Sequence, residues 1–243
     1  MTASLPMYDT PTTRAANDRF WHLIREDDTE LDRVTDPHVT WMSQHLVLSQ
    51  TCGLPYRRDL HGRVKLIGTP DYGVRGCPPG YYRSVVVVRR DDPRRNLSAF
   101  RDARLARNDR RSQSGWAAIE GHLAETGLGF SFAGRTHDTG AHALSAQAVI
   151  DGRADLASLD AVTWTLIKRE NPQARLLRVL CSTRPTPGLP YITSLRQDAD
   201  RLFDRASQAI ARLSGRDRAR LLLKGIVRIP ATAYLAEPLP PDG

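Results

Sequence analysis

The chain has 243 residues, of which 40% are hydrophobic and 26% charged, so it can bury a substantial core. This length fits either one large α/β domain or two lobes of roughly a hundred residues each. The formal net charge is +8, but the basic residues are interspersed with acids, as in 89–95, and no zinc-finger or RNA-recognition motif accompanies them. Nucleic acid is therefore not expected as a partner. No stretch approaches the roughly 20 apolar residues of a membrane-spanning helix, so membrane insertion is not expected either.

The first nine residues contain neither the basic segment nor the apolar segment that is typical of a secretory signal. As the sequence stands they favour the cytoplasm, whereas the periplasm is expected if the printed start is not that of the precursor. Three cysteines do not decide the compartment, and pairing of Cys52 with Cys77 stays open.

The first third of the chain is predicted to alternate between strands and helices. Strands are predicted at 5–8, 45–49 and 64–68, and an amphipathic helix at 13–24. In open α/β sheets, ligands bind beyond the carboxyl ends of strands, and Tyr8, Gln50 and Thr51 occupy such positions. We therefore expect these side chains to contact a ligand. The structural alternatives are that Tyr8 covers the edge of the core and that Gln50 and Thr51 satisfy loop amides.

An anion cradle is predicted in the middle of the chain, where a strand-length run at 103–106 is followed by a helix at 116–124. Ser112, Gln113, Ser114 and Gly115 lie between them. Ser112 is a natural N-cap, and the unpaired amides and positive dipole end of the first turn attract anions. Gly115 would let a ligand approach the backbone closely. The pattern favours a phosphate, phosphonate, sulfonate or carboxylate, although a simple helix cap also explains Ser112.

The second half continues the alternation. Further strands are predicted at 82–89, 154–159 and 174–182, helices at 141–150, 161–170 and 198–213, an irregular proline-rich stretch at 184–190, and a loose tail from 235. His137 and His142 stand five residues apart, which matches no metal-binding motif, so neither a metal nor a cofactor is predicted. A cysteine nucleophile with a histidine base is conceivable, but no local signature supports it.

Four stretches of the chain resemble the substrate-binding proteins of phosphate and phosphonate ABC transporters, the phosphonate-binding branch of the type II periplasmic-binding-protein fold. They are 82–88, 112–116, 136–145 and 151–160. That family shows Ser-Thr-Ser-Gly before an aromatic residue in the second stretch, a Ser-His-Asp or similar triplet in the third, and Gly-x-x-Asp-x-Ala-x-x-Asp in the fourth. Gln113 stands in place of the family's threonine, which leaves open a larger anion or a carboxylate with polar substituents.

The resemblance implies an α/β fold of two lobes, each a mixed sheet flanked by helices, with the ligand in a cleft between them. Lobe 1 would comprise 1–83 and 183–243, and lobe 2 would comprise 84–182, with hinge closure near Ser84 and Ser182.

The resemblance also implies two further ligand contacts. Thr136 and His137 would line the cleft at the start of a helix; the alternative is that this segment caps the helix and His137 is a loop hydrogen-bond partner. Asp160, an N-cap by default, would face the ligand and pair with an amino group, so that the ligand would be zwitterionic.

We predict a monomeric solute-binding protein, not an enzyme, that captures a small anion of the phosphate or phosphonate class for an ABC permease. The predicted ligand-binding residues are Tyr8, Gln50, Thr51, Ser112, Gln113, Ser114, Gly115, Thr136, His137 and Asp160. The alternative is a cytoplasmic enzyme or ligand sensor built on the same fold.

Overall fold

The computed structural model describes residues 1–241, which divide into two compact units. Unit 1 consists of Met1–Tyr81 and Pro187–Ala236, and unit 2 consists of Tyr82–Thr186 together with the segment that begins at Glu237. The chain passes between the units through two short strands, β4 (Tyr81–Tyr82) and β10 (Thr186–Pro187), which pair in a two-stranded sheet. Each unit is a sheet flanked by helices, so the predicted α/β architecture of two mixed sheets is confirmed.

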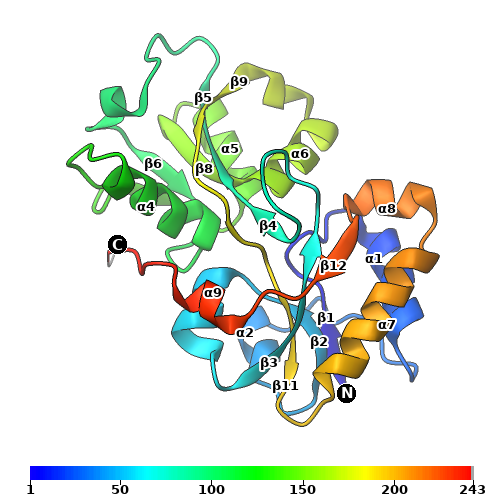
Figure 1. Cartoon of the computed structure of the whole chain (residues 1–243). Coiled ribbons are helices and arrows are strands. Elements are labelled where there is room, and N and C mark those ends of the chain that lie inside the picture. The colour runs from blue at the N-terminus through cyan, green and yellow to red at the C-terminus, as the bar shows by residue number, and fades with distance from the viewer. Residues whose placement is uncertain (242–243) are drawn as a thin grey trace. The chain divides into compact units, whose positions relative to one another are not determined.

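The sheet of unit 1 has five strands in the order β1-β2-β11-β3-β12 (Figure 1). β1 runs parallel to β2, whereas the other neighbours are antiparallel. β11 belongs to the segment that returns after unit 2, yet it lies between β2 and β3, so the sheet is complete only after the chain has returned. The strands are β1 (Thr2–Ser4), β2 (Leu46–Gln50), β3 (Val64–Asp71), β11 (Tyr191–Ser194) and β12 (Gly225–Val227).

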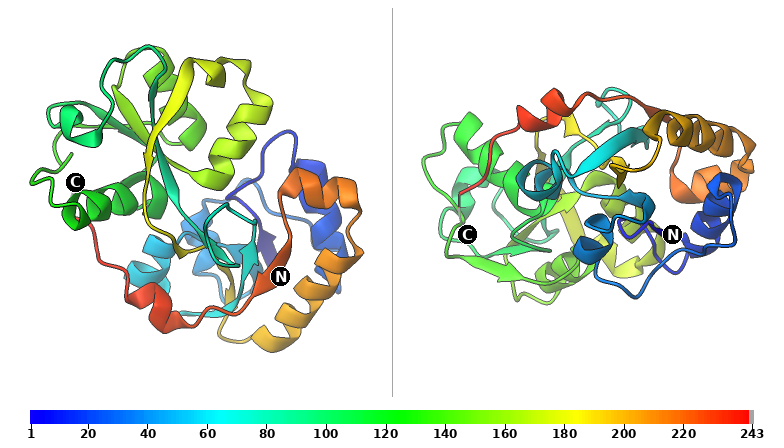
Figure 2. Two further views of the ribbon diagram at one scale, coloured as in Figure 1. Left: turned by 45° about the horizontal axis from the view of Figure 1, so that its top comes forward. Right: turned by 90° about the horizontal axis from the view of Figure 1, so that it is seen from below.

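Helices cover both faces of this sheet, and side chains of its strands enter two separate cores. Leu48 and Ile67 pack with α1, α7 and α8, whereas Leu46 and Val64 pack with α2, η1 and α9. Figure 2 shows α1 beside α7. The helices are α1 (Arg14–Ile24), α2 (Pro37–Trp41), α3 (Gly53–Pro55), the π-helical turn η1 (Tyr56–Leu60), α7 (Ala199–Arg212), α8 (Gly215–Leu221) and α9 (Ala231–Leu235).

The sheet of unit 2 has the order β7-β6-β8-β5-β9, in which β7, β6 and β8 are parallel and β5 is antiparallel to both of its neighbours. The valines of β5 explain why helices cover both faces. Val85 and Val87 enter the core with α5 and α6, whereas Val86 and Val88 enter the core that contains Trp116.

The elements of unit 2 agree with most of the predicted ranges. They are β5 (Ser84–Arg89), η2 (Leu97–Phe100), β6 (Leu105–Arg107), the π-helical turn η3 (Gln113–Ala117), α4 (Ala118–Glu125), β7 (Thr136–Asp138), α5 (His142–Ile150), β8 (Leu156–Asp160), α6 (Ala161–Glu170), η4 (Pro172–Leu176) and β9 (Leu177–Ser182).

Two predicted elements were wrong. The first strand is Thr2–Ser4 and not 5–8, because Ala3 and Ser4 pair with β2 whereas Pro6 has no amide to donate to a ladder. Thr136 and His137 lie in β7, paired with β6, and not at the start of a helix.

The tail is not loose where the structure describes it. Arg184 forms an ion pair with Glu237 at 2.6 Å, and the Trp116 indole N–H donates to the Pro241 carbonyl at 3.1 Å. These contacts explain why the segment from Glu237 belongs with unit 2, whereas the sequence assigned all of 183–243 to lobe 1. The last two residues of the predicted tail, 242 and 243, lie outside the described residues.

No helix between residues 1 and 241 is long and apolar enough to cross a bilayer. Cys52, Cys77 and Cys181 are half-buried thiols. Burial raises the pKa of Cys181 to about 11, so this thiol is protonated at neutral pH.

Candidate functional site

The predicted anion cradle at 112–115 forms the first turn of a continuous helical stretch, η3 followed by α4. Ser112 is the N-cap, as predicted, and its Oγ accepts a hydrogen bond from the Gly115 amide at 3.0 Å. All four residues are buried. The turn is π-helical, a rare geometry that is frequent at functional sites. The positive end of the helix dipole therefore lies next to the hydroxyl groups of Ser112 and Ser114, which are buried in unit 2.

The Ser114 carbonyl is a second fixed point of this turn. It accepts one hydrogen bond from Ser84 Oγ at 3.0 Å and another from Ser158 Oγ at 2.6 Å. Ser84 and Ser158 are buried and come from the adjacent strands β5 and β8. Because two strands of the sheet hold the same carbonyl, the orientation of the peptide between Ser114 and Gly115 is fixed by the sheet.

His142 faces the turn from the first residue of α5. Its Nε2 lies 2.9 Å from Ser114 Oγ, and its Nδ1 is buried with no hydrogen-bond partner among residues 1–241. The residue keeps some exposed surface, but burial of the ring lowers its pKa to about 4. The imidazole is therefore neutral at pH 7 and can offer a hydrogen bond to a ligand without adding a positive charge.

Arg107 and Asn108 pack against the other side of the turn. The buried Arg107 guanidinium lies 4.5 Å from the centre of the Trp116 ring and pairs with Asp138. A Cβ on Gly115 would lie 2.0 Å from Asn108 Oδ1. A side chain at 115 would therefore have to displace Asn108 or the turn, an internal reason for glycine that the sequence did not reveal.

Asp160 lies beside the same turn. It ends β8 opposite Ser84, whose hydroxyl binds Ser114. Its Oδ1 caps α6 by accepting from the amides of Val162 at 2.6 Å and Thr163 at 3.1 Å. The structure therefore brings Asp160 together with the predicted residues 112–115, and its default role as an N-cap is observed.

Thr136 and His137 are not part of this cluster. Thr136 lines a separate cavity with Arg104 and Arg153, at the amino ends of the parallel strands. His137 Nε2 lies 3.3 Å from Arg153 Nη1. A ligand role for these two residues stays a prediction, and the histidine that reaches the turn is His142.

In unit 1, Tyr8 and Gln50 come together around Tyr72. Gln50 Nε2 donates to Tyr72 Oη and to the Leu189 carbonyl, both at 3.1 Å, and the Tyr8 ring packs edge-on against Tyr72 with 4.9 Å between ring centres. They line a cavity of about 10 Å³, which is room for no more than about one water. Thr51 is fully buried, and its amide donates to the Pro190 carbonyl at 3.1 Å.

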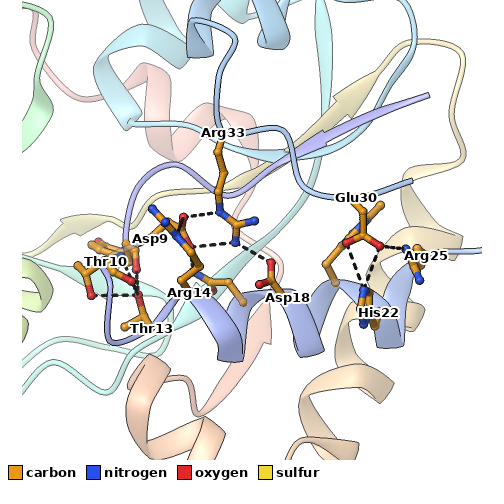
Figure 3. Close-up of polar contacts among 12 residues, drawn as sticks. Asp9, Thr10, Thr13, Arg14, Asp18, His22, Arg25, Glu30 and Arg33 are labelled. Atoms are coloured by element: carbon orange, nitrogen blue, oxygen red, sulfur yellow. Dashed lines mark hydrogen bonds and ion pairs between the residues drawn. The ribbon is translucent and has the colours of Figure 1, made fainter. Parts of the chain in front are cut away.

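The loop that carries Tyr8 is fastened to α1 (Figure 3). Thr13 Oγ1 donates to the Tyr8 carbonyl at 2.6 Å. The Asp9 carboxylate accepts from Arg33 at 2.7 Å and from Asn17 at 3.0 Å. Burial alone would raise the pKa of Asp9, but the hydrogen bonds from Arg33 and Asn17 outweigh it and hold this pKa below its usual value. Asp9 therefore stays charged and keeps the Tyr8 loop in place.

Three residues of the cluster in unit 2 were not predicted as site residues: His142, Ser84 and Ser158. Only His142 carried a usable signal, since it follows Gly140 at the start of a predicted helix; the two serines contact the turn through strand pairing. Within residues 1–241, no group of three or more His, Cys, Asp and Glu side chains is placed to hold a metal ion.

Comparison with known proteins shows the family of the chain. A family model described as the periplasmic substrate-binding protein of phosphonate ABC transporters matches residues 48–233. The chain belongs to this family. Its members are solute-binding proteins, so the predictions of the family and of a non-enzymatic role are confirmed. No protein among those with curated descriptions is significantly similar in sequence.

Solved structures of phosphonate-binding and related proteins share the fold. PhnD1 from Prochlorococcus marinus in complex with methylphosphonate is 14% identical, with a TM-score of 0.72 over 96% of this chain and 94% of that one. The binding component PA3383 of a Pseudomonas aeruginosa phosphonate transporter is 12% identical, with a TM-score of 0.70 over 96% and 82%. XAC2383 from Xanthomonas citri bound to ATP is 19% identical, with a TM-score of 0.66 over 96% and 92%.

Proposed function

We propose that this protein binds a small oxyanion of the phosphonate or phosphate class at the Ser112–Gly115 turn and presents it to the permease of an ABC transporter. The observation that carries the proposal is the Ser114 arrangement. Ser84 and Ser158 hold the Ser114 carbonyl, and the buried Ser114 hydroxyl, at the positive end of a helix, is hydrogen-bonded to a neutral His142. Neutral donors around a helix end suit a tetrahedral oxyanion, whose several oxygens each accept hydrogen bonds.

The role of the other predicted residues follows from the same proposal. Tyr8, Gln50 and Thr51 of unit 1 are further ligand contacts, as the family resemblance implies. Asp160 meets an amino group when the ligand carries one, since a carboxylate next to an anion is otherwise unfavourable. One chain carries all of these residues, so a monomer is sufficient for binding.

The test is titration of the purified protein with inorganic phosphate, a simple alkylphosphonate and an aminoalkylphosphonate. The melting temperature identifies the ligands, and calorimetry measures their affinities. A bound ligand raises the melting temperature by mass action. Ser114→Ala should weaken the binding of the best ligand roughly tenfold or more, as expected for a hydrogen bond to a charged group. Ser98→Ala, on an exposed side chain of the same unit, is the matched control and should leave the affinity unchanged. Equal affinities in Ser114→Ala and the wild type would remove the turn from the site.

Asp160→Asn tests the zwitterion. Asparagine keeps an oxygen for the cap of α6 and removes the charge. We expect it to weaken binding of the aminoalkylphosphonate and to leave the simple alkylphosphonate unaffected or bound more tightly. A parallel loss for both ligands would mean that Asp160 acts only through the helix cap.

A further inference from the structure

A cavity in unit 2 lies at the amino ends of the parallel strands β6, β7 and β8. The Ser112 turn lies elsewhere, after the carboxyl end of β6. Its volume is about 480 Å³, within the range of small-molecule sites. Its lining contains three arginines, two aspartates, one threonine, two glycines and one alanine, and no aromatic side chain. The lining residues are Asp102, Arg104, Gly134, Arg135, Thr136, Gly152, Arg153, Ala154 and Asp155.

Strand register forces two of these arginines together. Leu105 pairs with Thr136 in the parallel ladder, so the residues that precede them, Arg104 and Arg135, stand at neighbouring strand starts. The backbone bond from the Leu105 amide to the Arg135 carbonyl, 2.9 Å long, fixes this proximity. Like charges on neighbouring strands repel each other, so the proximity of Arg104 and Arg135 is electrostatically unfavourable. A bound anion would offset this repulsion.

Neither guanidinium is neutralised by the protein. Arg104 Nη1 donates to the Arg153 carbonyl at 3.0 Å, and Arg135 Nη2 donates to the Ser131 carbonyl at 2.7 Å. Neither arginine has a carboxylate partner within residues 1–241. Arg153, by contrast, pairs with Asp151 at 3.0 Å.

The two aspartates that line the cavity differ in their hydrogen-bond and ion-pair partners. Asp155 is already engaged: its Oδ1 pairs with Arg94 at 3.0 Å and its Oδ2 accepts the Arg104 amide at 2.9 Å. Asp102 is exposed in the lining and has no ion-pair partner among the described residues. It is therefore the one lining carboxylate that would oppose an anion directly.

Two turns leave the backbone open to a ligand. Gly134 and Gly152 adopt φ values of +77° and +73°, and a Cβ at either position would have no atom within 4 Å. Both turns immediately precede strands of the sheet, so a ligand between them would meet backbone as well as guanidinium groups.

We propose that this cavity is a second anion site, separate from the Ser112 turn, which takes a phosphate-bearing small molecule with at least two negative charges. The guanidinium forks of Arg104 and Arg135 match phosphate oxygens, and the lack of aromatic lining means that the charged group itself is what is recognised. Thr136, which the sequence singled out as a ligand contact, serves this cavity.

The test uses inorganic pyrophosphate as the probe, measured by calorimetry in the wild-type protein and in the Ser114→Ala background, which separates this cavity from the turn. The double variant Arg104→Gln/Arg135→Gln should lose pyrophosphate affinity roughly tenfold or more. Asp102→Asn should gain affinity, because it removes the opposing charge. Arg95→Gln/Arg175→Gln, which removes two exposed arginines of the same unit outside the cavity, controls for the change in net charge.

Binding should weaken as salt rises, since the site is exposed to solvent. Citrate in place of pyrophosphate distinguishes phosphate recognition from attraction of any polyanion, and equal affinity for both would overturn the phosphate assignment. The cavity is excluded as a site if Arg104→Gln/Arg135→Gln and Arg95→Gln/Arg175→Gln bind pyrophosphate equally, or if Ser114→Ala alone abolishes binding. Unchanged melting temperatures of the variants establish that a loss of affinity is not a loss of fold.

Discussion

Ser114 Oγ and His142 Nε2 lie 2.9 Å apart, although 28 residues separate them in the chain. The contact joins the first turn of one helical stretch to the first residue of α5, so two helix starts of unit 2 meet at one hydroxyl. Because burial keeps the imidazole neutral, the pair is a hydrogen-bonding device and not an ion pair.

The lowered pKa of His142 makes the stability of the protein sensitive to acid. Its pKa is lowered from 6.5 to about 4 in the folded protein, so between these values the unfolded chain binds a proton that the folded protein does not. The stability contributed by the neutral ring is complete above pH 6.5 and is lost as the pH falls towards 4, by at most about 1.4 kcal/mol per pH unit. Urea unfolding of the wild type at about pH 7 and about pH 5 measures the loss.

His142→Asn should remove much of this difference between the two pH values, since asparagine does not titrate. His45→Asn, on an exposed side chain, is the control and should retain the wild-type loss. An identical pH dependence in the wild type and in His142→Asn would mean that the ring is protonated in the folded state.

Local patterns of the sequence were sufficient for the Ser112 cap and for α6, because both depend on a capping residue followed by apolar residues at helical spacing. They were insufficient where pairing is long-range. The position of β11 between β2 and β3 and the reach of Ser158 to Ser114 depend on strands that are distant in the chain. The same limit applies to the histidines: the family pattern gave the segment and His137, but the contact of His142 with Ser114 is visible only in the structure.

The hydroxyls of Ser84 and Ser158 should act on the ligand through Ser114. Ser84→Ala and Ser158→Ala should each cost about 1 kcal/mol of unfolding free energy, the usual value for one buried hydrogen bond. Each should also weaken ligand binding, because the Ser114 carbonyl is then held from one side only. We expect the two changes to be non-additive, since both hydroxyls share one acceptor. A double-mutant cycle in which the effects on affinity simply add would contradict this coupling.

The segment that begins at Glu237 should be held mainly by one ion pair. Arg184 binds both Glu237 and Glu125, but the Glu237 side chain is 11% exposed whereas that of Glu125 is 42% exposed. Glu237→Gln should therefore destabilise the protein by roughly 1 to 3 kcal/mol, and Glu125→Gln by less than about 1 kcal/mol. Chemical denaturation of the two variants compares the same change of residue at two burials. Equal losses would show that the tail depends on the Trp116 to Pro241 hydrogen bond instead.

Two glycines of one helical stretch should respond oppositely to the same substitution. A methyl group at 115 would lie 2.0 Å from Asn108 Oδ1, so Gly115→Ala must displace Asn108 or the turn and should cost about 1 to 3 kcal/mol of stability together with ligand affinity. Gly121 lies in α4 with nothing within 4 Å of an added Cβ, so Gly121→Ala should stabilise by about 0.5 to 1 kcal/mol and leave binding unchanged. Thermal unfolding measures the stability of both variants, and calorimetry measures their ligand affinity. A gain of stability in Gly115→Ala would mean that Asn108 does not pack against the turn, whereas an intact fold with lost affinity would show that the turn tolerates the methyl group and the ligand does not.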